Sequence, residues 1–317
     1  MKNQFIYTFT IATILLFSCK DKTEDTKTSP DTTPQWESNV TSSDIRKHFD
    51  LQSITGTSTT ISSATGGTVT INGFSATVPA DAFANQDGSP YNGNVKLSIS
   101  IITNSEGMLK SGITTVNDSG DLLISAGMFK LDALNETNNN KLKLRPGIKF
   151  GSEIPGFDLN NKVFEGVAAA GNNKVVWEEW DSTNIKRGNN TFIFGLDKLF
   201  TWCNLDRYMN EKPLTDITIT TPAGYTNKNT ECFIKYTGEN ATAYIPANST
   251  LKAFSTQGGF YKVVVGRAAK ILCFSKRDGK FYYEIKTIAA IAANQTLAMT
   301  NLLETTEANL NIVISSF

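Results

Sequence analysis

The chain has 317 residues, and its 30 Lys and Arg balance its 30 Asp and Glu, so the formal net charge is zero. A protein that binds nucleic acid or an anionic membrane surface needs a basic face to release counterions, and this balance argues against that class. The only histidine, His48, argues in the same way against most histidine-dependent catalysis and most histidine-ligated metal sites.

The N-terminus has the pattern of an export signal. Lys2 is followed by a mostly apolar run from Phe5 to Ser18 that contains no charged residue. The run is shorter than the roughly 20 residues that a membrane-spanning helix needs. Residues 1–18 are therefore predicted to be a signal peptide and not part of the fold.

The end of this run resembles the lipobox of bacterial lipoproteins. Leu16-Phe17-Ser18-Cys19 places a branched residue first, a small residue before the cut and then the cysteine. The resemblance implies that Cys19 becomes the first mature residue and carries a diacylglyceryl thioether and an N-acyl chain. Several acyl chains anchor a protein firmly, whereas one chain binds only marginally. An ordinary secretory signal with a chance cysteine is the alternative.

Lys20 to Asp25 form a charged cluster that resembles the acidic export signal of Bacteroidetes surface lipoproteins. This resemblance implies an outer-membrane anchor that faces the cell exterior, with a periplasmic orientation as the alternative. Residues 19–50 are then the lipidated cysteine and a flexible tether. Residues 20–43 are mostly Thr, Ser, Asp, Lys and Pro, and Trp36 is their only large apolar residue, so little surface is available to offset the entropy of ordering.

Residues 51–155 are predicted to form a β-sandwich. Val95, Leu97, Ile99 and Ile101 alternate with polar residues, which is typical of a half-buried antiparallel strand, and similar alternation runs through residues 69–78. Pairs such as Asn72-Gly73 supply the residues that tight turns need.

Three stretches of this region resemble a motif series of uncharacterised Bacteroidetes surface lipoproteins: Gly66-Gly67-Thr68-Val69, Ala76 to Phe83, and Tyr91-Asn92-Gly93-Asn94-Val95. The series is more distantly similar to the β-sandwich interaction module of ankyrins and netrin receptors. The resemblance implies a binding or scaffolding module and carries no enzymatic part.

Residues 156–210 are predicted to be an aromatic-rich segment that connects two domains. Its candidate ligand-binding residues are Trp177, Glu178, Glu179 and Trp180, with Asp181 and Trp202 as further members. If exposed, the indole rings would stack on sugar rings and the carboxylates would accept hydrogen bonds from hydroxyl groups. The favoured alternative is that the aromatic residues belong to the core, because aromatic side chains dominate cores by area.

Residues 211–317 are predicted to form a second, smaller β domain. Its apolar strands include Cys232 to Tyr236 and Ile271 to Phe274, and Asp278-Gly279 predicts a hairpin turn. Glu304 to Phe317 have helical spacing, with Thr305 or Thr306 as the N-cap, so a short C-terminal helix is expected. The expected fold class is mainly β, with two sandwich-like domains.

Few residues are suited to chemistry. Once Cys19 is lipidated, Cys203, Cys232 and Cys273 remain; no two form a CxxC pair, and no metal or cofactor is predicted. Cys232 and Cys273 are expected to be small buried hydrophobic residues rather than a disulfide, although their pairing stays open.

Two catalytic arrangements are the alternatives to this view. A Ser-His-Asp arrangement would need His48, which lies beside the predicted tether and lacks preorganisation. Glu178 with Asp206 is the weak candidate for a pair of carboxylates that hydrolyses glycosides. Trp202 to Tyr208 resembles an element that follows the sandwich in the same lipoproteins, where Asp206 and Arg207 would hold a turn.

The expected function is a non-enzymatic outer-membrane lipoprotein that binds or scaffolds at the cell envelope. Its partners are the membrane, through Cys19, and a glycan or envelope protein, but not nucleic acid. The alternative is a glycan-binding or glycoside-processing lipoprotein that uses residues 177–181, and a third hypothesis is peptide binding at an exposed strand edge. The ligand and the oligomeric state stay open.

Overall fold

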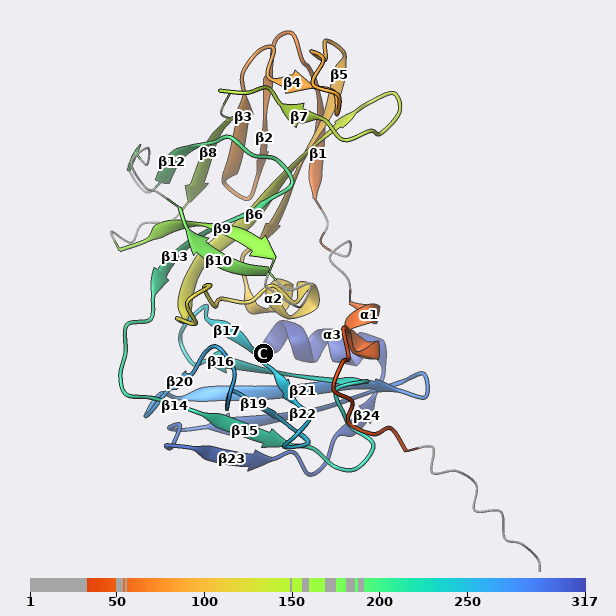
Figure 1. The fold of residues 1–317 in the computed structure, drawn as a ribbon, viewed down its shortest axis with the longest axis vertical. Coiled ribbons are helices and arrows are strands. Elements are labelled where there is room, and N and C mark those ends of the chain that lie inside the picture. Colours follow the sequence, from red (N-terminus) through yellow and green to blue (C-terminus); the bar gives the residue numbers. More distant parts are fainter. Residues whose placement is uncertain are drawn as a thin grey trace, which may run out of the picture. The chain divides into compact units, whose positions relative to one another are not determined.

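The computed structural model describes residues 33–49, 54, 56–148, 150–155, 160–168, 175–180, 186–187 and 191–317 (Figure 1). The fold is mainly β, with 48% strand and 9% helix, which confirms the expected fold class. Residues 34–317 form one compact unit, and residues 1–33 are grouped separately. The predicted signal peptide and Cys19 lie outside the described residues. None of the described helices has the length and apolar character needed to cross a membrane.

A six-stranded antiparallel sheet forms one layer of the first β unit. Its strands, in spatial order, are β1 (Thr57–Ser62), β5 (Asn94–Ile102), β6 (Leu123–Asn135), β13 (Trp202–Tyr208), β9 (Lys162–Ala168) and β10 (Val175–Glu179). The alternation predicted for residues 95–101 is present in β5, where Val95, Leu97 and Ile99 are fully buried. One face of this strand therefore points into the core.

A five-stranded sheet forms the opposite layer. Its order is β11 (Lys186–Arg187), β12 (Thr191–Leu196), β8 (Phe150–Pro155), β3 (Phe74–Val78) and β2 (Gly67–Ile71). Phe74 and Phe150 of this sheet share one core with Leu97 and Phe129 of the first sheet, so the unit is a β-sandwich. A short two-stranded sheet, β4 (Phe83–Ala84) with β7 (Lys143–Leu144), closes one end, and Phe83 is buried there.

The segment 156–210, predicted to connect two domains, is instead part of this sandwich. Strands β9, β10 and β13 extend the six-stranded sheet, and β12 pairs with β8 in the five-stranded sheet. The sequence does not show this because a strand pairs with whichever strand lies beside it in the fold. β13 pairs with β6, whose residues are far away in the chain, and such a pairing leaves no local sequence signal.

The second β unit also has two layers. One sheet has the order β17 (Thr242–Ile245), β16 (Thr230–Tyr236), β21 (Ala269–Arg277), β22 (Lys280–Ile288) and β24 (Leu303–Thr305). The other has the order β18 (Ala247–Asn248), β19 (Ala253–Ser255), β15 (Ile217–Thr220) and β23 (Gln295–Ala298), and a separate pair joins β14 (Leu214–Thr215) to β20 (Val263–Val264). The predicted hairpin at Asp278-Gly279 joins β21 to β22, with both turn residues at positive φ.

Three short helices complete the fold. They are α1 (Asp44–His48), α2 (Ser105–Ser111) and α3 (Glu307–Ser316). The hydroxyl of Thr306 accepts a hydrogen bond from the Asn309 N–H at 3.2 Å, so Thr306 is the N-cap of the predicted C-terminal helix. Ile45 of α1, Leu109 of α2 and Leu310 of α3 are buried on the outer face of the sheet that contains β16.

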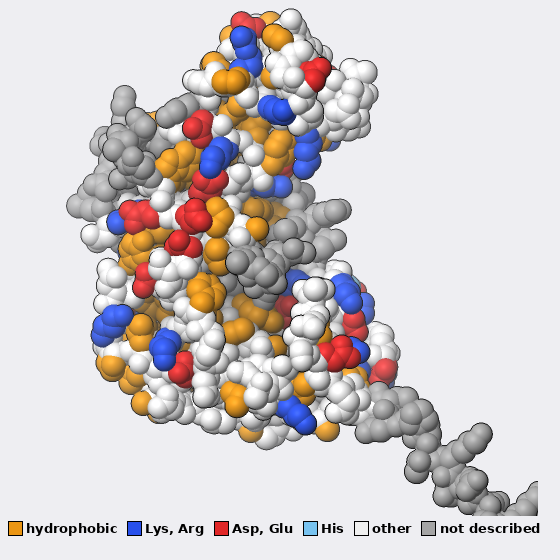
Figure 2. All heavy atoms as spheres, viewed as in Figure 1, with side chains coloured by type: hydrophobic (Ala, Val, Ile, Leu, Met, Phe, Trp, Pro, Cys, Tyr) orange, Lys and Arg blue, Asp and Glu red, His pale blue; other side chains and the backbone are white. Residues whose placement is uncertain are grey.

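Charged side chains are spread over the visible surface. Figure 2 shows Lys and Arg side chains in small groups between acidic and apolar ones on this face, without one large basic area. Some ion pairs are exposed on both side chains, as in Lys47 with Asp44. Such pairs contribute about 0 to 1 kcal/mol each.

The predicted tether, residues 19–50, extends too far, because its later residues are folded. Trp36 packs against the core of the second β unit, and its ring meets Phe254 edge-on at 5.1 Å between centroids. Ile45 is fully buried, and Phe49 is nearly so. The composition of the segment does not predict this folded part, because a few apolar side chains in a mostly polar segment are enough to dock it on a sheet.

Arg46 of α1 fastens this segment through a buried ion pair. Its guanidinium lies 2.6 Å from Oε2 of Glu231 in β16, whose side chain is 4% exposed. The same guanidinium donates hydrogen bonds to the carbonyl groups of Leu109 and Lys110 at the end of α2. Ser43, the N-cap of α1, donates to Oε1 of Glu231. One cation thus joins α1, α2 and β16.

Replacing Arg46 with Ala should lower the free energy of unfolding by about 3 to 5 kcal/mol, because the Glu231 carboxylate would stay buried without its partner. The matched control is Lys47→Ala in the next residue, which removes an exposed pair and should cost less than about 1 kcal/mol. Urea unfolding of both variants measures the difference. Equal stability of the two variants would contradict the proposed role of Arg46.

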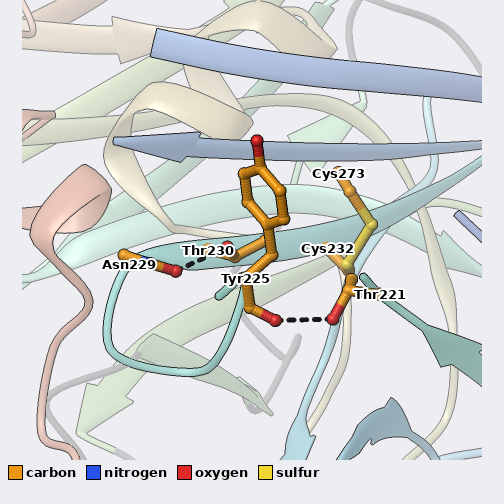
Figure 3. The surroundings of a disulfide bond; sticks show 6 residues. All are labelled: Thr221, Tyr225, Asn229, Thr230, Cys232 and Cys273. Carbon is orange, nitrogen blue, oxygen red and sulfur yellow. Dashed lines mark hydrogen bonds between the residues drawn. A yellow bond between two sulfur atoms is a disulfide. The ribbon is translucent and has the colours of Figure 1, made fainter. Parts of the chain in front are cut away.

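Cys232 and Cys273 form a disulfide, so the expectation that both are unpaired hydrophobic residues is wrong. The two residues face each other across the antiparallel pair β16 and β21, with their Cα atoms 4.3 Å apart. Both are fully buried, and Figure 3 shows them beside Thr221 and Tyr225, whose carbonyl accepts a hydrogen bond from the Thr221 hydroxyl at 2.6 Å. The sequence shows both strands but not the register between them, and the register decides the pairing.

The disulfide should be visible in a thiol map of the denatured protein. Alkylation in denaturant without reductant should label Cys203, and proteolysis should release linked peptides that contain Cys232 and Cys273. In the chain-entropy treatment, a bridge over a sequence separation of 41 stabilises by about 4 kcal/mol, so the Cys232→Ala, Cys273→Ala double variant should unfold at much lower urea. Alkylation of all three cysteines before reduction would contradict the bridge.

Candidate functional site

The candidate ligand-binding residues lie on and just after the edge strand β10. Trp177 is fully buried, and its indole N–H donates to the carbonyl of Thr114 at 2.6 Å. Its ring packs with Ile102, Met108 and Phe164. The hypothesis of an exposed stacking ring is therefore wrong for Trp177. β10 is the last strand of its sheet, and the segment after α2 contacts its open edge, where the Asp118 N–H donates to the Trp177 carbonyl at 2.9 Å.

The neighbours of Trp177 are more accessible. Trp180 is half-buried and packs against the sandwich core, whereas Glu178 and Glu179 are exposed. Glu179 pairs with Lys162 at 2.8 Å and accepts a hydrogen bond from the Tyr208 hydroxyl at 2.8 Å. Burial raises the pKa of Glu179, but the hydrogen bonds from Lys162 and Tyr208 outweigh it and lower the pKa.

The further members of the group do not complete a platform. Trp202 is 7% exposed and packs in the same cluster as Trp177. Asp181 lies outside the described residues. The structure therefore brings two exposed carboxylates and one half-buried indole to this edge, and it buries the other two rings.

Asp206 is the most perturbed carboxyl group among the described residues. Its side chain is fully buried, and Oδ2 accepts a hydrogen bond from the Asn204 amide at 2.5 Å. The Ser125 hydroxyl donates to Oδ1 of Asn204 at 2.9 Å, which extends the network to β6. Oδ1 of Asp206 has no hydrogen-bond partner among the described atoms. Burial raises the pKa of Asp206 to about 8, so the carboxyl group is protonated at neutral pH.

This burial removes Asp206 from the hypothetical catalytic pair with Glu178. A carboxyl group with no exposed surface does not touch a glycosidic bond, whereas Glu178 lies at the surface. Asp206 and Arg207 lie within β13, so the prediction that they hold a turn is wrong. A β-bulge between Leu205 and Asp206 shifts the register of β13 against β6, and no local sequence pattern marks it.

The polar network instead joins the sandwich to the second β unit. The Ser125 N–H donates to the Asn240 carbonyl at 3.0 Å, and the Asn240 amide donates to the Ser125 carbonyl at 2.9 Å. Beside them, Arg207 pairs with Glu239 at 3.2 Å in the turn between β16 and β17. These contacts give the Asp206 region a structural role at the junction.

The pKa of Asp206 predicts how stability depends on pH. The unfolded carboxyl group releases its proton near pH 4, but the folded one keeps it until about pH 8. The folded state therefore binds more protons than the unfolded state between these values, and this group's contribution to stability falls as pH rises from about 4 to 8.

The Asp206→Asn variant should remove this slope, because the amide is neutral at every pH and has the same shape. Urea unfolding at pH 4.5, 6 and 7.5 should show the variant gaining stability relative to the wild type as pH rises. Asn204→Ala is a control that keeps the carboxyl group and should retain the slope. A constant difference between Asp206→Asn and the wild type across this range would show that the carboxyl group is ionised in the folded protein.

His48 also has structural neighbours. Its Nε2 lies 3.0 Å from Oε1 of Glu307 in α3, and its Nδ1 lies 3.3 Å from the Lys276 ammonium. The ring packs against Phe49 and Phe281. Within the described ranges, no group of three or more His, Cys, Asp or Glu residues could hold a metal ion.

No protein-family model and no curated protein matches this chain.

Proposed function

We propose that the chain is a non-enzymatic lipoprotein of the outer membrane, anchored through Cys19 and facing the cell exterior. Its β units bind or scaffold a partner at the cell envelope. The observation that supports export best is the disulfide between Cys232 and Cys273, because structural disulfides form in oxidising compartments and are rare in the cytosol.

The position of the folded unit agrees with an anchor at Cys19. The compact unit begins at Pro34, so residues 20–33 separate the lipobox cysteine from the fold. The signal pattern, the small residue Ser18 and Cys19 follow one another in the order that lipidation requires.

Binding or scaffolding is favoured because the side chains suited to chemistry have structural roles. Trp177 and Asp206 lie in packed or hydrogen-bonded interiors, and Cys203 is buried. Burial raises the pKa of the Cys203 thiol, which opposes formation of the nucleophilic thiolate. With these reactive side chains in the interior, the surface of the sandwich is the part that can contact a partner.

Cys19→Ala should abolish anchoring, because the thioether is the only link to the bilayer in this proposal. Expressed in a bacterium that processes lipoproteins, the variant should accumulate as an unprocessed or soluble form, and globomycin should block processing of the wild type. Mass spectrometry of the mature wild type should find Cys19 at the N-terminus with a diacylglyceryl group and an N-acyl chain.

Cys203→Ala is the matched control, since it removes another cysteine and should leave fractionation unchanged. Protease added to intact cells should digest the wild type if it faces outward, and should spare it if it faces the periplasm. An unmodified thiol at Cys19, or full membrane retention of Cys19→Ala, would refute the anchor.

A further inference from the structure

A hollow of about 370 Å³ lies at the end of the sandwich, outside the residues considered so far. Its walls come from β7 with its flanking residues and from the loop that precedes β13. The lining consists of Gln86 and the stretches Lys141 to Leu144 and Asp197 to Thr201. The volume is at the small end of the range of about 300 to 1,000 Å³ that ligand pockets occupy.

The floor of the hollow is apolar. Leu142 is buried in the sandwich core, and Leu144 and Leu199 are partly buried against it. Because the core holds these residues, the floor is part of the rigid sandwich rather than of a free loop. It presents a surface on which the apolar face of a small ring can lie.

Phe200 stands beside this floor in a conformation that a bulky residue rarely adopts. Its φ is +63°, in the left-handed region, where a side chain of this size is a true outlier. The Phe200 N–H donates to the Leu131 carbonyl of β6 at 2.9 Å, which fixes the conformation. Such backbone strain costs about 1 to 3 kcal/mol and concentrates at ligand-binding positions.

The rim carries an excess of positive charge. Lys141, Lys143 and Lys198 face one lining carboxylate, Asp197. Lys198 pairs with Glu165 at 2.7 Å, so its charge is largely balanced.

The other two ammonium groups have no carboxylate within ion-pair distance among the described residues. Lys141 lies over the Phe200 ring at 4.8 Å from its centroid, and Lys143 donates a hydrogen bond to the Gln86 carbonyl. The charge of Lys143 also helps to lower the pKa of nearby Asp87, after the stronger effect of hydrogen bonds from Ser89.

We propose that this hollow binds an acidic sugar residue of a glycan. The C–H face of the sugar ring lies on Leu199 and Phe200, and its carboxylate or sulfate takes the ammonium groups of Lys141 and Lys143. The proposal rests on the binding role proposed above but not on the lipid anchor. It places recognition away from residues 177–181.

The apolar floor and the two lysines together favour this class of ligand. A neutral sugar would cover the floor but leave the two ammonium groups without an anionic partner. A free inorganic anion would pair with the lysines but leave the apolar floor uncovered. A ring that carries an anionic group uses both, and we take carboxylated and sulfated sugars as its source.

Isothermal titration of the full-length protein in detergent tests the proposal with a panel of defined probes. The probes are a galacturonate trisaccharide, a glucuronate-containing trisaccharide, a sulfated galactose trisaccharide, a neutral galactose trisaccharide and inorganic sulfate. At least one acidic trisaccharide should bind at least tenfold more tightly than the neutral sugar and than sulfate. Higher salt should weaken this binding because the partners are exposed charges.

Variants then locate the site. K141Q/K143Q should weaken binding of the preferred acid at least tenfold, whereas K212Q/K252Q, which removes two exposed lysines elsewhere, should change it less than twofold. Phe200→Asn should weaken binding by a similar factor without a large fall in melting temperature, because Asn tolerates positive φ and the lost ring was only half-buried. If Phe200→Asn does not fold, the lysine pair carries the test alone.

Several outcomes would overturn the proposal. They are equal binding of acidic and neutral sugars, binding of inorganic sulfate alone, absence of binding to every acidic probe, and equal effects of the two lysine pairs. Because the anchor is tested separately by mass spectrometry at Cys19, a lipidated protein that ignores acidic sugars would reject this site and leave the anchor intact. An unlipidated protein that binds acidic sugars would reject the anchor and leave this site intact.

Discussion

The sheet that contains β16 and β21 is buried on both faces, and most of the second β unit is arranged to cover it. Along β16, Cys232 and Ile234 point into the core shared with the four-stranded sheet, whereas Phe233 points to the opposite side. A sheet with two apolar faces needs two covering layers. The four-stranded sheet supplies one layer, and α1, α2 and α3 supply the other.

That second layer explains why a polar N-terminal segment is ordered. Ile45 and Phe49 fill part of the outer face, and α3 adds Leu310 and Ile314. Apolar contacts alone would allow α1 to dock in more than one position. The ion pair between Arg46 and Glu231 selects one position, because a buried charge is strongly destabilising unless its partner lies within ion-pair distance.

Local patterns were enough to predict several strands but not their partners. The alternation around Leu97, the turn at Asp278-Gly279 and the N-cap at Thr306 are local, and the structure has all three. The pairing of β13 with β6 and the opposition of Cys232 and Cys273 depend on register between distant segments, which no local pattern encodes. α2 was missed because its seven residues span too few turns to show helical spacing.

The aromatic residues show why a site is harder to predict than a strand. Trp177 directly precedes Glu178, and Phe200 lies two residues after Lys198, so the local sequence gives no reason to expect one ring inside and the other at the surface. Trp177 satisfies its indole N–H on the Thr114 carbonyl and disappears into the core, whereas Phe200 is held at the surface by a hydrogen bond from its own backbone to β6. The lysines that join Phe200 come from β7 and the residues just before it, almost sixty residues earlier in the chain. The two rings thus differ in the acceptors that their N–H groups find: the Thr114 carbonyl for the Trp177 indole and the Leu131 carbonyl for the Phe200 backbone. Both acceptors come into place only after the sheets have paired.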